Sequence, residues 1–207
     1  MSLVKYNNNS ISAITTAGQL ASGNMVLIKE QTASSSATIS FVDGSSDVVL
    51  DSTYPIYKFE FINIHPATDN TALSFQGNAS GGSGYNETIT STFFQANHSE
   101  DGSGGSLGYR TSEDQAQGTA FQQLGYGVGN GNDECASGYL HLFNPSSTTF
   151  VKHFISRVQV YHKSDISYDM YSAGYFNTTS AIDEIQFKMS SGNIDAGTFK
   201  LYGIKDS

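Results

Sequence analysis

Short runs of alternating apolar and polar residues, separated by turn-forming residues, constrain this chain more than any other feature. In one such run the apolar residues are Tyr57, Phe59 and Phe61, and the residues between them are Lys58 and Glu60. A period of two places the apolar side chains on one face of a β-strand and the polar ones on the other. We therefore expect Tyr57, Phe59 and Phe61 to face a core.

The same period recurs from residue 25 onward. Further alternating pairs and triplets are Val26 and Ile28; Ile39 and Phe41; Ile89 and Phe93; Ile185, Phe187 and Met189; and Phe199 and Leu201. No helical pattern of ten residues lies between these runs, and turn signals such as Asp43-Gly44 separate them. The chain is therefore predicted to be all-β, a single antiparallel β-sandwich spanning residues 25–207. The run Phe150 to Lys163 is apolar on both faces, which predicts either a central strand covered on both faces or a bulged strand.

Residues 1–24 have a different character. They contain few large apolar side chains and no sustained period. A segment of this composition cannot bury enough surface to fold alone. We expect an extended N-terminal arm that either stays mobile or packs along another subunit. The arm also lacks the basic-then-apolar pattern of a secretory signal, which predicts no export by that route.

Composition narrows the classes of partner. The chain has 19 acidic and 10 basic residues, a net charge of -9, and its bases stand singly. A nucleic-acid surface needs clustered bases, and a membrane span needs a long apolar run, so neither partner is expected. Cys135 is the single cysteine, which excludes an intramolecular disulfide and a zinc site made of thiolates.

The segment 97–134 is the unusual part of the chain, rich in glycine and acidic residues. Its acids are Glu100, Asp101, Glu113, Asp114, Asp133 and Glu134, and its one base is Arg110. We expect a long loop, with a short helix over Ser112 to Gln123 that Ser112 would cap and Gly118 would weaken. The carboxylates would either bind a calcium ion or form a solvated acidic loop.

Several patterns that resemble catalytic motifs do not have the context that the chemistry requires. Gly104 to Gly108 matches the G-x-S-x-G elbow of hydrolases, but a polar segment precedes it where a buried strand is needed. The glycines from Gly125 to Gly131 have the wrong spacing for a phosphate loop and are predicted to form a turn. Adjacent acids in a strand, Asp183 and Glu184, point to opposite faces. The chain is therefore predicted to have no catalytic, cofactor-binding or metal-binding residues and not to be an enzyme.

Several stretches of the sequence resemble those of a known family of proteins. The closing SSGNIDAGTFKLYGI and the internal HLFNPSSTTFVKHF are the most specific, and YKFEFINIHPATDN and YNETITSTFFQANH add to them. With these, the chain from Lys5 to Ile204 resembles virion-associated proteins of tailed phages, especially marine and cyanobacterial ones. The resemblance implies a non-enzymatic β-sandwich of the jelly-roll type, assembled as a homotrimer in a virion that forms in the host cytoplasm.

Two roles in such a particle remain open at this point. A capsid decoration, or cement, protein would bind the major capsid protein or other virion subunits and stabilise the shell. A tail or head fibre would bind a host glycan, with Tyr85, Tyr109, Tyr126 and Tyr139 as sugar platforms. The chain lacks a rod-forming repeat or coiled coil, which favours decoration.

Overall fold

In the computed structural model, which describes residues 24–205, every regular element is a β-strand. The strands are β1 (Met25–Ser36), β2 (Ile39–Val42), β3 (Ile56–Pro66), β4 (Thr71–Ala79), β5 (Ile89–Ser99), β6 (Gly105–Tyr109), β7 (Ala116–Gly118), β8 (Gln122–Val128), β9 (Ala136–Phe143), β10 (Lys152–His162), β11 (Ile166–Phe176), β12 (Ile182–Met189) and β13 (Ile194–Ile204). All their pairings are antiparallel, which confirms the predicted fold class. None of the described residues forms a helix that could cross a membrane.

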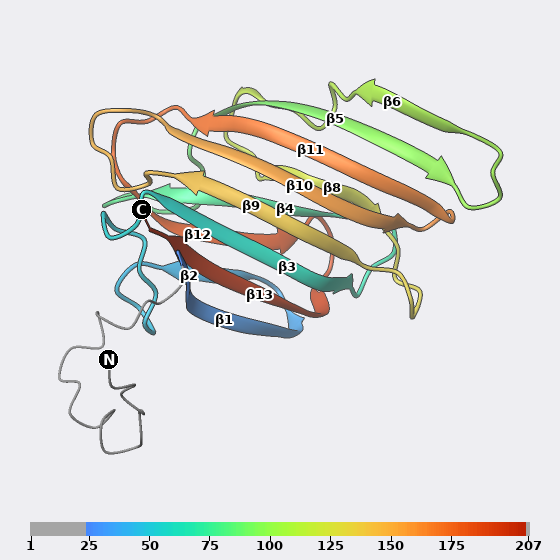
Figure 1. Cartoon of the computed structure of the whole chain (residues 1–207), viewed down its shortest axis with the longest axis horizontal. Coiled ribbons are helices and arrows are strands. Elements are labelled where there is room, and N and C mark those ends of the chain that lie inside the picture. Colours follow the sequence, from blue (N-terminus) through green and yellow to red (C-terminus); the bar gives the residue numbers. More distant parts are fainter. Residues whose placement is uncertain (1–23, 206–207) are drawn as a thin grey trace, which may run out of the picture.

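The strands form two layers. The larger layer has the order β1-β13-β3-β9-β10-β11-β5-β6, with the three-residue β7 also paired to β5, and the smaller has the order β8-β4-β12-β2. In Figure 1 the larger layer faces the viewer and the smaller layer lies behind it. A single residue pair, His162 with Val128, joins the two where β10 meets β8.

Eight strands follow the winding of a jelly roll. From β1 to β4 the chain alternates between the larger and the smaller layer, and the pairs β8–β9 and β12–β13 cross between the layers in the same way. This places β1-β13-β3-β9 opposite β2-β12-β4-β8, as a double-sheet jelly roll requires. The jelly-roll expectation is therefore confirmed.

Two insertions enlarge the larger layer. One insertion, β5 to β7, lies between β4 and β8 of the chain; the other, β10 and β11, lies between β9 and β12. Together they add the strands β10, β11, β5 and β6 beyond β9, which we call the extension. The extension forms the upper part of the sheet in Figure 1 and ends at the edge strand β6.

The core between the layers is built mainly from phenylalanine. Phe187 of β12 is fully buried, and its ring centroid lies 5.1–6.3 Å from those of Phe41, Phe59, Phe61, Phe75 and Phe199. Offset and edge-to-face ring pairs at such distances add to the stabilisation by burial. The predicted core residues Tyr57, Phe59 and Phe61 are at most 1% exposed, so the predicted strand face is confirmed.

The run from Phe150 to Lys163 forms β10, a central strand without a bulge. It pairs residue by residue with β11 along its whole length. Phe154, Val158 and Val160 are buried toward the core, but Ile155 on the opposite face is 49% exposed. The strand is therefore neither bulged nor, within the described chain, covered on both faces. Its outward apolar residues belong to a surface.

The segment 97–134 contains β6, β7 and β8, so the helix predicted over Ser112 to Gln123 is wrong. Gln122 explains why, because its buried side chain donates to the carbonyl of Glu113 at 2.9 Å and accepts from the hydroxyl of Ser91 at 2.6 Å. Gln76 of β4 likewise donates to the carbonyl of Ala120 at 3.0 Å. These long-range bonds satisfy backbone groups that a helix would have satisfied locally, and they fasten the segment to the sandwich.

Replacing Phe187 tests the core. Phe187→Ala should lower the free energy of unfolding by about 3–5 kcal/mol, because it removes the ring that contacts five others. Phe150→Ala is the control, since Phe150 is 69% exposed, and should change stability by less than about 0.5 kcal/mol. Urea unfolding followed by circular dichroism measures both, and equal losses would contradict the assignment of Phe187 to the core.

Replacing Gln122 tests the fastening of the acidic segment. Gln122→Leu should cost about 1–3 kcal/mol, because it leaves the Ser91 hydroxyl and the Glu113 carbonyl without their partner. Limited proteolysis should then cut between residues 97 and 121 faster than in the wild type. Gln159→Leu alters an exposed glutamine and should leave the cleavage rate unchanged. A wild-type cleavage pattern in Gln122→Leu would show that the network does not hold this segment.

Candidate functional site

Most of the residues in the motif-like glycine patterns lie in strands, and Gly104, Gly129 and Gly131 lie just outside them. Ser106, the serine of the G-x-S-x-G pattern, lies in the edge strand β6, where its backbone N–H donates to Asn97 Oδ1 at 3.1 Å. Gly125 and Gly127 lie within β8, so the predicted glycine-rich turn is wrong for this part. Gly125 is required by packing, because a Cβ there would come within 2.8 Å of Val160 Cγ2.

The acidic pairs are spread over the surface. No group of three or more His, Cys, Asp or Glu side chains that could hold a metal ion occurs among residues 24–205. Glu134 accepts a hydrogen bond from the backbone N–H of Gly131. Cys135 lies beside Asp133 in a hollow of about 540 Å³, and burial raises the pKa of its thiol. A raised pKa keeps the thiol protonated, which disfavours nucleophilic chemistry.

The four tyrosines considered as sugar platforms do not lie together. Tyr126 packs against the core, with the Arg110 guanidinium 5.2 Å from its ring centroid. Burial raises the pKa of Tyr85, which is partly exposed on the loop after β4 and bonds to Glu184. Tyr109 and Tyr139 share one row on the side of the larger layer that points away from the smaller layer.

Three neighbouring rows of cross-strand pairs run across this side of the larger layer, and we call the part of the side that they form the outer face. The first row is Glu30, Lys200, Glu60, Tyr139, Arg157, Tyr171, Phe94 and Tyr109; the second is Leu27, Tyr202, Lys58, His141, Ile155, Ala173 and Thr92; the third is Ser137, Gln159, Asp169, Ala96 and Leu107. Directly paired residues point to the same side of a sheet. The first row therefore runs unbroken over eight strands.

An aromatic stack dominates the outer face of the extension. The rings of Phe94 and Tyr171 lie parallel, with centroids 4.8 Å apart and an interplanar angle of 6°. Arg157 lies 5.0 Å from the centre of the Tyr171 ring and forms two hydrogen bonds to Asp169, at 2.9 and 2.7 Å. The Tyr171 hydroxyl also donates to Asp169, at 2.9 Å. The four side chains thus hold one another in fixed positions.

The extension also exposes large apolar side chains. On its outer face Phe94 is 41%, Ile155 49%, Tyr109 53% and Leu107 75% exposed. Single exposed apolar residues are common, but a contiguous set is typical of an interaction surface. The outer face of the extension therefore resembles a binding surface.

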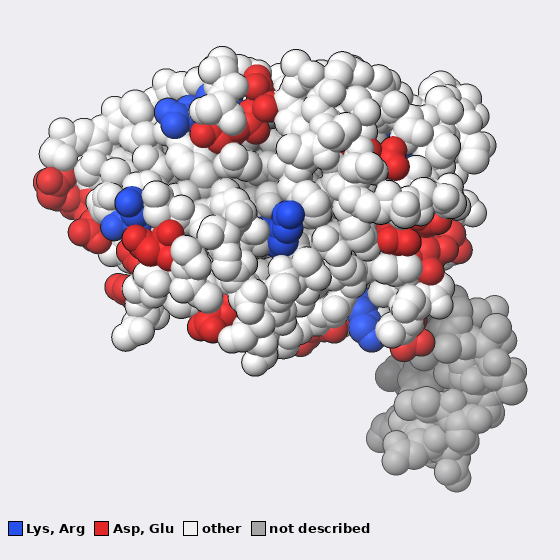
Figure 2. All heavy atoms as spheres, turned by 180° about the vertical axis from the view of Figure 1, so that it is seen from behind, with Lys and Arg blue, Asp and Glu red and all other residues white. Residues whose placement is uncertain are grey.

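Charge is distributed unequally over the molecule. The outer face has three bases and three acids, paired as Lys58–Glu60 at 2.6 Å, Arg157–Asp169 at 2.7 Å and Lys200–Glu30 at 3.1 Å. Setting aside these six and the undescribed Lys5 and Asp206, the chain has 15 acids and six bases. The outer face is thus neutral, and the rest of the described molecule has the whole excess of nine negative charges. Figure 2 shows the opposite side, where carboxylates outnumber basic groups.

Among the ionisable groups of the outer face, His141 and Asp169 have pKa values lowered from their ordinary values. Burial, and to a lesser extent the charge of Lys58, lowers the pKa of His141, so that this imidazole is neutral at pH 7. The hydrogen bonds from Arg157 hold the pKa of Asp169 below its ordinary value. Both shifts preserve a neutral surface near pH 7.

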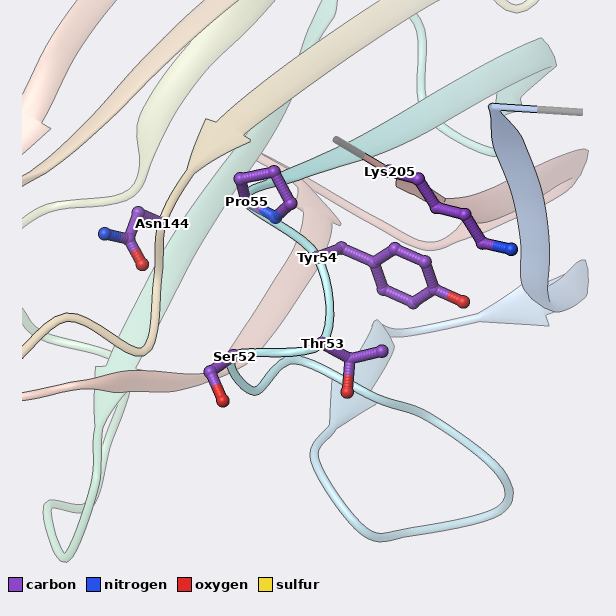
Figure 3. A pocket seen from close by; sticks show the side chains of 6 residues that line it. All are labelled: Ser52, Thr53, Tyr54, Pro55, Asn144 and Lys205. Carbon is purple, nitrogen blue, oxygen red and sulfur yellow. The ribbon is translucent and has the colours of Figure 1, made fainter. Parts of the chain in front are cut away.

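A separate hollow of about 470 Å³ lies at one end of the sandwich (Figure 3). Its lining residues are Ser52, Thr53, Tyr54, Pro55, Asn144 and Lys205. The Tyr54 ring packs on Gly203, where a Cβ would come within 2.3 Å of the ring. The backbone N–H of Lys205 donates to the carbonyl of Asn24 at 2.8 Å, so this hollow lies where the described chain begins and ends. Hydroxyl, amide and amine groups line it, without a carboxylate or imidazole.

Comparison of the chain with family models, with curated proteins and with solved structures finds no match. The outer face is therefore interpreted from its geometry and charge.

The shifted pKa of His141 predicts a pH dependence of stability. Above its ordinary value of 6.5 the imidazole is neutral in both states. Below that value the unfolded chain takes up a proton first, so the free energy of unfolding should fall as the pH decreases. His141→Gln should reduce this slope between pH 6.5 and 5, leaving the part due to His162, whose pKa burial also lowers. Urea unfolding at several pH values measures the slope; an unchanged slope would contradict the shift.

Proposed function

We propose that this chain is a non-enzymatic structural protein of a phage virion, a capsid decoration protein that binds the assembled shell through its outer face. The observation that carries the proposal is the neutral, aromatic outer face on a chain with a net charge of -9. The sequence resemblance to virion proteins supplies the biological context.

The composition of the outer face favours a protein partner. Tyrosine, phenylalanine and arginine are enriched at the centres of protein interfaces, and the extension places Tyr171, Phe94 and Arg157 in contact. The twenty positions of the three rows, each covering about 4.8 by 6.8 Å, make up roughly 650 Å². That area is close to the roughly 800 Å² that each partner contributes to a standard interface.

The alternative role, a glycan-binding fibre, is supported mainly by Tyr109. A sugar stacks on a free ring face, but Tyr171 and Phe94 cover one another, and Tyr139 has Lys58 5.5 Å from its ring centroid. Tyr109 is 53% exposed at the edge of the sheet and is the one candidate of the four tyrosines with a largely open ring. The geometry therefore favours the decoration role.

The homotrimer and the N-terminal arm are part of the same proposal. Residues 1–23 lie outside the described residues, so the expected arm is represented only by Asn24. Asn24 precedes β1, which is one edge of the larger layer, whereas β6 is the other edge. An arm that starts at β1 can reach a neighbouring subunit while the extension contacts the shell. Light scattering of the purified protein tests the trimer, and a stable monomer at micromolar concentration would contradict it.

A charge placed in the aromatic stack tests the docking surface. Phe94→Glu should weaken binding to purified, undecorated particles by more than tenfold, because it buries an unpaired carboxylate in the contact. Val42→Glu is the matched control, since Val42 is a partly exposed apolar residue in β2 of the smaller layer, outside the extension and the three rows. Thermal unfolding confirms that both variants fold. Equal binding by the two variants would exclude the extension as the docking surface.

Particles that lack the protein distinguish the two roles. Binding to the assembled shell only should stabilise that shell by mass action, so the temperature of shell disruption should rise with occupancy. Particles without the protein should break at a lower temperature but still adsorb to cells. Particles that remain equally robust and lose adsorption would instead support the receptor-binding role.

A further inference from the structure

We infer that the partner inserts an uncharged, apolar side chain into a hollow over Ala173 on the outer face. This inference rests on the proposed function, because it identifies the partner as a protein surface of the shell. It adds a defined contact, the position of that contact and the chemistry of the group that fills it.

The hollow exists because one small residue lies among larger ones. Ala173 pairs with Ile155 on one side and with Thr92 on the other, and Tyr171 and Tyr175 flank it along β11. The space over these residues has a volume of about 450 Å³, enough for a leucine or phenylalanine side chain. A depression with an alanine floor and aromatic walls suits an inserted side chain.

The lining determines the chemistry of the occupant. The walls are aliphatic and aromatic, and His153 packs edge-on against Tyr175 with ring centroids 5.9 Å apart. The hydroxyl of Thr92 already donates to the carbonyl of Ala173, at 3.3 Å. The lining contains no Lys, Arg, Asp or Glu side chain, and Arg157 and Asp169, further along β10 and β11, are bonded to each other. A charged group in the hollow would lose water without gaining a partner, whereas an apolar group would gain contacts.

The fold itself does not require the hollow. The neighbouring Gly174 is required for packing, because a Cβ there would come within 2.8 Å of the Phe154 ring on the core side. Ala173 points to the other side of the sheet and lines the surface hollow. A larger side chain at position 173 would therefore fill the hollow without disturbing the core, which makes the position a direct test.

Charge distinguishes the shell from a second copy of the chain as the occupant. Each copy has nine excess negative charges outside its outer face, so joining two copies through their outer faces would add like charges around the contact. We expect the proposed trimer to form through the arm and not through this face. A partner with a neutral, apolar surface matches the outer face without that repulsion. We therefore assign the hollow to a side chain of the shell protein.

Filling the hollow is the primary experiment. Ala173→Phe should weaken binding to purified, undecorated particles by more than tenfold, while its thermal unfolding temperature stays within a few degrees of the wild type. Ala173→Ser keeps the hollow open and should bind within threefold of the wild type. If the wild type binds and Ala173→Phe binds equally well, the hollow is not used and the inference is wrong, although the proposed function stands. If the wild type does not bind particles, the proposed function and the inference both fail.

A cross-linking measurement identifies the occupant directly. Ala173→Cys in a Cys135→Ser background, labelled with a benzophenone maleimide, should form a photoproduct with the shell protein on decorated particles. The same label at Val42→Cys, in β2 of the smaller layer, should give little of that product. A product between two copies of this chain, or loss of the oligomer in Ala173→Phe by light scattering, would assign the hollow to self-association and overturn the inference.

Discussion

The contact of Phe187 with five other rings is the interaction on which the rest of the structure depends. It joins β12 of the smaller layer to β3 and β13 of the larger layer, and it fixes the separation of the two sheets. A core of rings has few alternative packings, so it fixes the inner side of the sandwich strands whose outward residues begin the first row. The outer face is thus a consequence of what is buried beneath it.

Backbone hydrogen bonds that start from the jelly roll fix the position of each strand in the extension. β10 pairs with β9 over seven residues and with β11 over eleven, so each added strand is placed by the strand before it. The register then decides which side chains meet, and it brings Arg157, Tyr171 and Phe94 together from three strands. Rigid strands position such groups more exactly than loops can. This is the physical reason to look for function on the sheet face.

The sequence predicts the features that depend on local period and fails where distant segments meet. The alternation around Phe59 correctly identifies a core strand, and the absence of helical patterns correctly identifies an all-β sandwich. The helix predicted near Ser112 is wrong because Gln122 and Gln76, whose roles no local pattern reveals, satisfy the backbone there. The stack of Phe94 on Tyr171 was equally hidden, because it depends on a register between strands 77 residues apart. The pairing of acids with bases that makes the outer face neutral could not be predicted either, because it depends on the same strand register.

The pairing of the two insertions has a consequence for the order of folding. β5 comes from the first insertion, yet its long partner is β11 of the second, as in the pair Ile89 and Phe176. Contacts between segments so distant in sequence form slowly, because closing a long loop costs chain entropy before the contact offsets it. We therefore expect the stack to assemble late in folding. A chain that has stopped part-way through folding presents no finished outer face, so under the proposed function it would not yet bind its partner.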